Sequence, residues 1–194
     1  MDIEEAVKKS LGPQNLSDFC ETGYGWVSRV KESFMLGPRY LVSYNYPTQV
    51  DEIEYILQFS RDANRDLLRD FYRSTNGMRI LSDHFVVPGV RFWTPELHGL
   101  DFFNIPLDIQ VMSGFEYPRH APVSGAVIGS SFRTIDGTTL HLKDILADDG
   151  RIVCGFFQED ASVLETFPDF QTWIAKRIDG AKAEYAALLR SKMI

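Results

Sequence analysis

The sequence predicts one folded domain that combines helices with strands. Of its 194 residues, 44% are hydrophobic and 13% are aromatic, which is typical of a globular core and excludes disordered or collagen-like chains. The length favours a single domain over residues 1–194, since one domain takes roughly 150 residues. Helical periodicity occurs in the first 75 residues and near the C-terminus, whereas strand and turn patterns prevail from Met78 onward.

The N-terminal segment predicts a short amphipathic helix. Its apolar residues fall on one helical face: Ile3, Ala6, Val7 and Leu11. Gly12-Pro13 then supplies the residues that end a helix. The region 14–46 is ambiguous, because one set of apolar residues has helical spacing while Tyr40–Tyr44 favours a strand. The helical set is Trp26, Val27, Val30 and Phe34.

Two further helices are expected before Met78. The first begins near Thr48, where Asp51 completes an N-cap arrangement, and its buried stripe is Ile53, Ile56 and Leu57. The second runs from about Asn64 to Thr75, and Gly77 is expected to be its left-handed terminal residue. The side chains expected to face inward from it are Leu67, Leu68, Phe71 and Tyr72.

The region after Met78 predicts strands joined by tight turns. The strand patterns are Phe85–Val87, Val90–Trp93, Ala126–Gly129, Thr138–Leu142 and Ile152–Phe157. Asp136-Gly137 and Asp149-Gly150 are turn sequences. The stretch from Leu97 to Pro122 has many prolines and little periodicity, which indicates an irregular excursion.

A long helix is expected near the C-terminus. Thr166 is its expected capping residue, and Pro168 and Asp169 suit its first turn. The inward stripe is Phe170, Trp173, Ile174 and Ile178. Gly180 is expected to interrupt the helix before Tyr185, Leu188 and Leu189 resume the helical period.

The charge of the chain is acidic and concentrated in one segment. The 20 basic and 27 acidic side chains give a net charge of −7. Between Asp136 and Asp169, eight acidic and two basic residues account for −6 of it. Such a segment would repel nucleic acid and speed encounter with a basic protein, although most acidic runs are simply solvated surface.

No catalytic, cofactor or metal motif occurs in the sequence. The histidines share no metal-ligand spacing, and Cys20 and Cys154 stand apart, so we expect buried free thiols, no disulfide and no metal site. Gly23-Tyr24-Gly25 lacks the rest of a dinucleotide fingerprint, and no phosphate-binding loop is found. No cofactor and no enzymatic activity are therefore expected.

One helical face carries arginines at every fourth position: Arg61, Arg65, Arg69 and Arg73. An aspartate lies three residues before each of the last three arginines: Asp62, Asp66 and Asp70. This is the spacing at which opposite charges pair on a helix, so a self-neutralised solvated face is favoured over a phosphate-binding one.

The apolar stretches are far shorter than the ~20 residues of a membrane span, and the first residues are acidic where a signal peptide would be basic. We therefore expect a cytoplasmic protein without membrane contact.

The run Asn64–Gly77 resembles the L-x-x-F-Y/L-x-x-x-N-G helix of the SUKH superfamily. Later segments resemble the family's I-G, D, G-x-V/I and S/T-F-x-x-F/W-L/I progression in order and spacing: Val127–Ser131, Asp136-Gly137, Asp149–Val153 and Thr166–Ile174. The resemblance covers about residues 48–178 and leaves residues 1–45 as an extension. One departure is Asp62-Ala63-Asn64, where the family often has Leu-Pro before the helix.

The resemblance implies an α+β domain in which N-terminal and C-terminal helices pack on a mostly antiparallel sheet. Bacterial SUKH proteins look like non-catalytic immunity proteins that neutralise a cognate toxin, commonly a nuclease or deaminase. Fungal members are regulators of cell-wall synthesis, so a regulatory or scaffold protein is the alternative. A third hypothesis is an enzyme whose site lies beside His120 or His141.

An acidic patch with aromatic anchors could cover the basic cleft of such a toxin. Four acidic residues lie at turn or strand-end positions of the acidic segment and are the expected partner contacts: Asp148, Asp149, Glu159 and Asp160. We expect a monomer whose partner is a protein toxin with a basic surface, not nucleic acid or a membrane.

Overall fold

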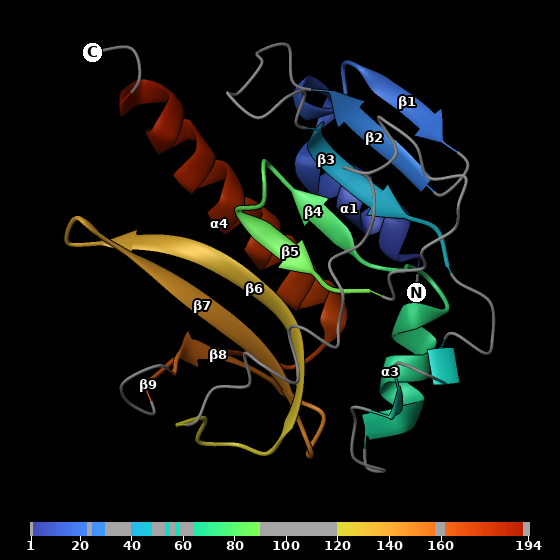
Figure 1. Cartoon of the computed structure of the whole chain (residues 1–194), viewed down its shortest axis with the longest axis vertical. Helices are drawn as coiled ribbons and strands as arrows, with labels where there is room; N and C mark the ends of the chain where they lie inside the picture. The colour runs from blue at the N-terminus through green and yellow to red at the C-terminus, as the bar shows by residue number, and fades with distance from the viewer. Residues whose placement is uncertain are drawn as a thin grey trace, which may run out of the picture.

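A computed structural model of the chain describes residues 2–22, 25–29, 40–47, 53–54, 57–58, 64–89, 120–157 and 162–191. These residues form one antiparallel sheet of nine strands, whose order in space is their order along the chain. Helices lie against the sheet (Figure 1). The expected α+β class with an antiparallel sheet is therefore confirmed.

The strands are β1 Phe19–Thr22, β2 Gly25–Arg29, β3 Tyr40–Asn45, β4 Met78–Ile80, β5 Phe85–Val87, β6 Gly125–Ile135, β7 Thr138–Ala147, β8 Ile152–Phe156 and β9 Ser162–Phe167. The helices are α1 Ile3–Leu11, the 3-10 helix η1 Pro13–Asn15, α3 Arg65–Tyr72 and α4 Phe170–Ser191. Strand β1 forms one edge of the sheet and β9 the other. The pairing of β8 with β9 shifts register between Cys154 and Gly155, so β9 is bulged.

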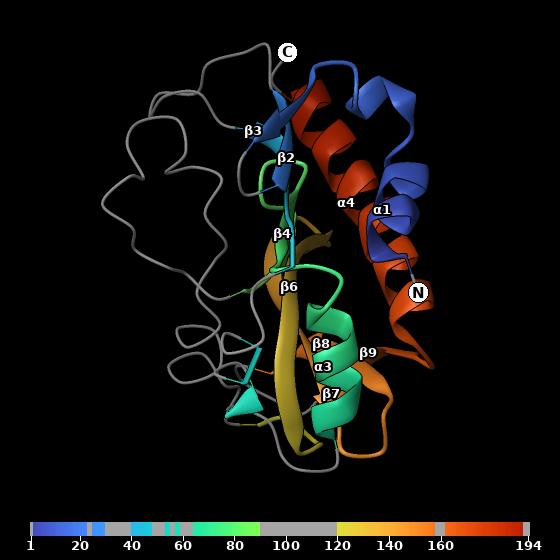
Figure 2. The ribbon, with the colours of Figure 1, turned by 90° about the vertical axis from the view of Figure 1, so that its right-hand side faces the viewer.

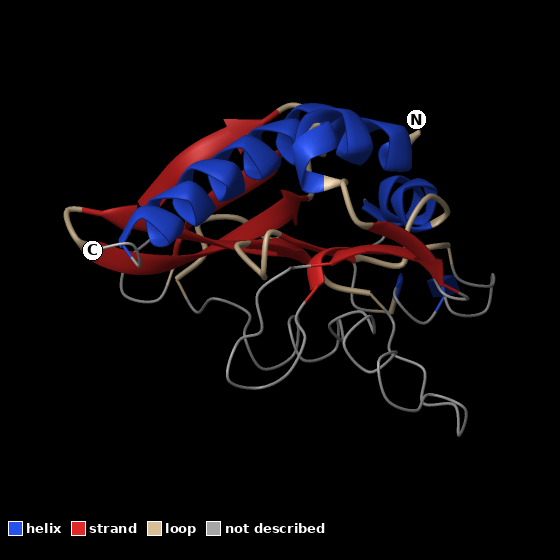
Figure 3. Ribbon diagram, turned by 90° about the horizontal axis from the view of Figure 1, so that it is seen from above, coloured by secondary structure: helices blue, strands red, loops and turns tan. Residues whose placement is uncertain are grey.

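Helices α1 and α4 lie side by side on one face of the sheet (Figures 2 and 3). Helix α1 has the expected bounds, and Asp2 caps it by accepting a hydrogen bond from the Glu5 amide at 3.0 Å. Its buried residues are Ile3, Val7 and Leu11, and those of α4 include Trp173, Ile174 and Ile178. The apolar stripes that the sequence marks are thus the faces that meet the sheet.

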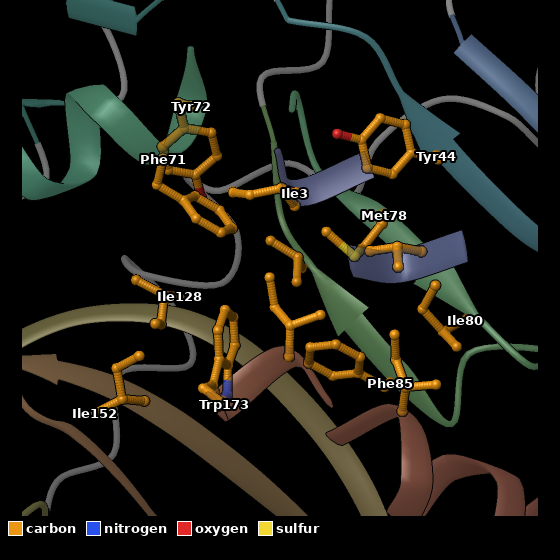
Figure 4. Close-up of a cluster of buried hydrophobic side chains, with 14 of the residues drawn as sticks. Ile3, Tyr44, Phe71, Tyr72, Met78, Ile80, Phe85, Ile128, Ile152 and Trp173 are labelled. Atoms are coloured by element: carbon orange, nitrogen blue, oxygen red, sulfur yellow. The ribbon is translucent and has the colours of Figure 1, made fainter. Parts of the chain in front are cut away.

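Trp173 is one of two fully buried tryptophans of the core formed by the described residues. Figure 4 shows its indole pointing into a cluster to which the sheet contributes Phe85, Ile128 and Ile152. Its ring centroid lies 5.4 Å from that of Phe85 and 6.0 Å from that of Phe71 on α3. A smaller cluster on strands β6 to β8 consists of Val127, Ile145, Ala147, Val153 and Phe157.

The segment after α3 ties the helix to the end of β3. The Asn76 amide donates to the Asn45 carbonyl, and the Asn45 amide donates to the Gly77 carbonyl, both at 3.0 Å. The Thr75 hydroxyl also donates to the Asn45 carbonyl. The expectation that Gly77 is the terminal residue of this helix is wrong, because the helix ends at Tyr72. Gly77 does adopt a positive φ of 90°.

Gly77 is also required because a side chain at this position would clash with the backbone, which is not the case for Gly180. A Cβ atom on Gly77 would lie 2.6 Å from the Val87 carbonyl oxygen, whereas one on Gly180 would meet nothing within 4 Å. We expect Gly77→Ala to lower the free energy of unfolding by about 1–3 kcal/mol. Gly180→Ala, inside α4, should raise it by roughly 0.5–1 kcal/mol. Urea denaturation measures both, and equal changes would contradict the assignment.

Four other expectations differ from the structure. Trp26 and Val27 lie in strand β2, not in a helix, although Tyr40–Tyr44 is a strand as expected. Leu67 is exposed on α3 instead of facing inward. Thr166 belongs to strand β9, and the residue that caps α4 is Asp169, whose carboxylate accepts from the Thr172 amide at 2.7 Å. Helix α4 continues through Gly180 without interruption.

Several expectations are confirmed or lie outside the described residues. The predicted strands at 85–87, 126–129, 138–142 and 152–157 fall in β5 to β8, and the two Asp-Gly turns connect strands. The capping pair Thr48 and Asp51, the strand Val90–Trp93 and nearly all of Leu97–Pro122 lie outside the described residues. In the described part of the chain, no helix is long and apolar enough to span a membrane.

Candidate functional site

Two of the four expected partner contacts lie in the turn between β7 and β8. Asp148 is half-buried there and Asp149 is exposed, whereas Glu159 and Asp160 lie outside the described residues. Asp149 is paired with Arg151, 2.6 Å from carboxylate to guanidinium, and also accepts from the Arg151 amide at 3.1 Å. These hydrogen bonds lower the pKa of the Asp149 carboxyl, so it stays ionised at neutral pH.

The β7–β8 turn lies against the outer side of helix α3. Asn64, at the start of α3, donates its side-chain amide to the Leu146 carbonyl at the end of β7, at 3.2 Å. A Cβ atom on Gly150 would be 3.5 Å from the Leu67 side chain. Leu67 is 43% exposed and lies where the turn and the helix meet.

Charged residues lie next to Leu67 along helix α3. Asp66 pairs with Arg69, and Asp70 pairs with Arg73 at 3.4 Å. These are the intrahelical pairs expected from the i,i+3 spacing, so the predicted self-neutralised face is confirmed for this part of the arginine stripe. We call this area the turn–helix surface and define it by Asp66, Leu67, Asp70, Asp149 and Arg151.

A buried ionic network joins α4 to the sheet. Arg177 of α4 donates through Nε to Asp144 of β7 at 2.9 Å and through Nη1 to Glu165 of β9 at 3.0 Å. Its Nη2 also donates to Asp144. The side chain of Asp144 is fully buried and that of Arg177 is 7% exposed. Burial of these charges is tolerated only because they are paired with each other.

Gly129 of β6 has no side chain, which leaves room for the ionic network and for the ring of Trp173. A Cβ atom at this position would lie 2.7 Å from the Trp173 ring and 3.2 Å from an Asp144 carboxylate oxygen. Gly129 and Trp173 both belong to the segments that carry the SUKH resemblance. Together with Gly77, they are scaffold positions, not surface positions.

Cys154 of β8 lies beside this network but is not a reactive group. Burial raises the pKa of its thiol, and the Asp144 carboxylate raises it further. The thiol therefore stays protonated at neutral pH and is a poor nucleophile. Neither cysteine forms a disulfide, and Cys154 is buried as expected, whereas Cys20 is only half-buried.

The two histidines considered for an enzyme lie in different settings. His141 of β7 stacks on Phe132 of β6, with ring centroids 4.7 Å apart. His120 is exposed, five residues before β6 begins. Within the described residues, no group of three or more histidine, cysteine, aspartate or glutamate side chains is arranged to hold a metal ion.

Comparisons with protein-family models, with curated proteins and with solved structures find no match to this chain. The class that the fold defines is an α+β protein, with one antiparallel sheet and helices packed on it.

The thiols provide a direct check of the packing around Asp144. In the native protein, we expect the half-buried Cys20 to react readily with a thiol reagent such as DTNB, and the buried Cys154 to react only after unfolding. Absorbance of the released thiolate in native buffer and in denaturant measures this difference. A Cys20→Ser variant should lose the fast phase. Rapid reaction of both cysteines would contradict the buried position of Cys154.

Proposed function

We propose that this protein is a non-catalytic immunity protein that binds a cognate toxin, a nuclease or another effector that acts on nucleic acid, and thereby neutralises it. The turn–helix surface carries the proposal. It places an exposed leucine among ionised side chains on two rigid elements, a helix and a strand-connecting turn. Protein interfaces commonly combine an apolar centre with a polar rim.

The scaffold role of the motif residues also supports the proposal. Gly77, Gly129 and Trp173 occupy buried positions that fix the backbone or fill the core. The SUKH resemblance rests on such residues and specifies no catalytic set. A family that retains its core and varies its surface is suited to binding different toxins with one fold.

The charges around Leu67 suit a partner with a basic patch. The carboxylates of Asp66 and Asp70 are exposed, and each is held by an arginine of the same helix. A cation of the partner can share these carboxylates without the cost of burying an unpaired charge. Such contacts accelerate association, while burial of Leu67 would slow dissociation.

Co-expression with the toxin domain encoded beside this gene tests the proposal. Growth rescue together with a stable complex in gel filtration is the expected result. If both proteins are folded and neither rescue nor a complex is seen, that toxin is not the partner. The regulatory or scaffold function is then favoured.

A matched pair of leucine variants tests the surface itself. We expect Leu67→Asp to weaken toxin binding at least roughly tenfold, because it places a charge at the apolar centre of the interface. Leu189→Asp is the control, since Leu189 is similarly exposed, at 38%, but lies near the end of α4. Titration calorimetry measures both. Unchanged binding by Leu67→Asp, with the wild type bound, would place the interface elsewhere.

A further inference from the structure

A cleft of about 390 Å³, lined by both polar and apolar side chains, lies between strand β6 and helix α4 and shares no residue with the turn–helix surface. Strand β9 contributes Glu165 to its lining, β6 contributes Arg133, and α4 contributes Lys176, Arg177 and Glu184. Its volume lies in the range of pockets that hold small molecules, roughly 300–1,000 Å³. Figure 3 shows the C-terminal helix α4 lying over one face of the sheet.

The carboxylates of the cleft already have partners. Glu165 accepts from Arg177 at 3.0 Å and lies 3.7 Å from Arg133. Glu184 accepts from the Thr134 amide at 3.1 Å and so joins α4 to β6. Arg177 is in turn committed to Asp144 and Glu165.

Two basic side chains of the cleft remain able to bind an anion. The Arg133 side chain is 47% exposed, and its ion pair with Glu165 is long, at 3.7 Å. Lys176 is exposed and forms no ion pair with another residue in the described part of the chain. An arginine and a lysine that flank one cleft can bind the oxygens of a phosphate or carboxylate group.

Gly180 also borders the cleft. It lines the cleft from within α4, and a Cβ atom added there would meet nothing within 4 Å.

We propose that the cleft binds a small organic anion, whose phosphate or carboxylate group lies between Arg133 and Lys176. This site does not depend on the toxin-binding proposal. The anion would neutralise the two cations without displacing Arg177 from its buried partners.

Titration calorimetry at low ionic strength, with inorganic phosphate, ribose 5-phosphate and citrate as probes, tests the proposal. Saturable binding of at least one probe is expected, weakened roughly tenfold or more in Arg133→Gln and in Lys176→Gln, since each substitution removes a charge-assisted hydrogen bond. Lys182→Gln is the control, because Lys182 pairs with Asp179 outside the cleft lining. Binding of the phosphates alone would assign a phosphate ligand, and binding of citrate alone a carboxylate ligand.

Gly180→Leu separates the cleft from the general charge of the surface. The larger side chain fills the cleft while both cations remain, so the proposal requires binding to be lost and the circular dichroism spectrum to stay native. Failure of all three probes to bind, or equal binding by wild type and Gly180→Leu, would overturn the proposal.

Discussion

Arg177→Met is expected to lower the free energy of unfolding by about 3–5 kcal/mol, one of the two largest effects predicted for this protein. The substitution leaves the fully buried Asp144 carboxylate without its guanidinium partner. It also removes the hydrogen bond from α4 to Glu165 on the edge strand β9. Urea denaturation followed by circular dichroism measures the change.

The double variant Asp144→Leu with Arg177→Met is the control for this prediction. It removes both charges of the pair, so most of the lost stability should return. If the double variant is as unstable as the single one, loss of packing and not the unpaired carboxylate accounts for the effect.

Trp173→Ala is expected to lower the free energy of unfolding by about 3–5 kcal/mol as well. The indole is fully buried and contacts rings from three directions: Phe71, Phe85 and Phe170. Truncation leaves a cavity between the sheet, α3 and α4 that neighbouring side chains cannot fill. Thermal or urea unfolding measures the loss.

An exposed residue of the same helix provides the comparison for Trp173. Leu189→Ala should change the free energy of unfolding by less than about 0.5 kcal/mol, because Leu189 lies on the solvent side of α4. A small effect of Trp173→Ala, similar to that of Leu189→Ala, would contradict the central position of the indole.

The sequence predicts those elements whose apolar residues mark one face. Helix α1 and the stripe of α4 follow this rule, and both bury most of the expected side chains, although Ala6 and Phe170 are only half-buried. Strand β2 has no single apolar face, because the adjacent residues Trp26 and Val27 are both buried. A strand covered on both faces shows no alternation, and its spacing to Val30 and Phe34 imitates a helix.

Local signals also misplaced the start of α4. Thr166 and Pro168 resemble a helix start, yet Thr166 completes strand β9, and Asp169 provides the cap. A helix start at Thr166 and a strand that includes Thr166 both satisfy local sequence preferences. The pairing of β9 with β8 places Thr166 in the strand. Leu67 is exposed and not inward-facing for a related reason, since the sequence does not show how much of the α3 surface the rest of the fold covers.

The candidate sites depend on contacts between distant segments. Asp144 and Arg177 are separated by 33 positions. The available signals were a single aspartate in an apolar strand and an arginine within the stripe of α4, and neither identifies the partner of the other. The proximity of Leu67 to Gly150 is equally a product of the tertiary fold.

The order of the strands leaves the sheet open, with β1 and β9 as its edges. Open edges present unpaired amides and carbonyls to which a strand of another molecule can add, which is a common route to aggregation. Here the edge at β1 is only four residues long, and the bulge in β9 interrupts its regular spacing. Neither edge strand is long and flat enough to pair readily with a strand of another molecule, so the described part of the sheet is protected against fibril-like growth.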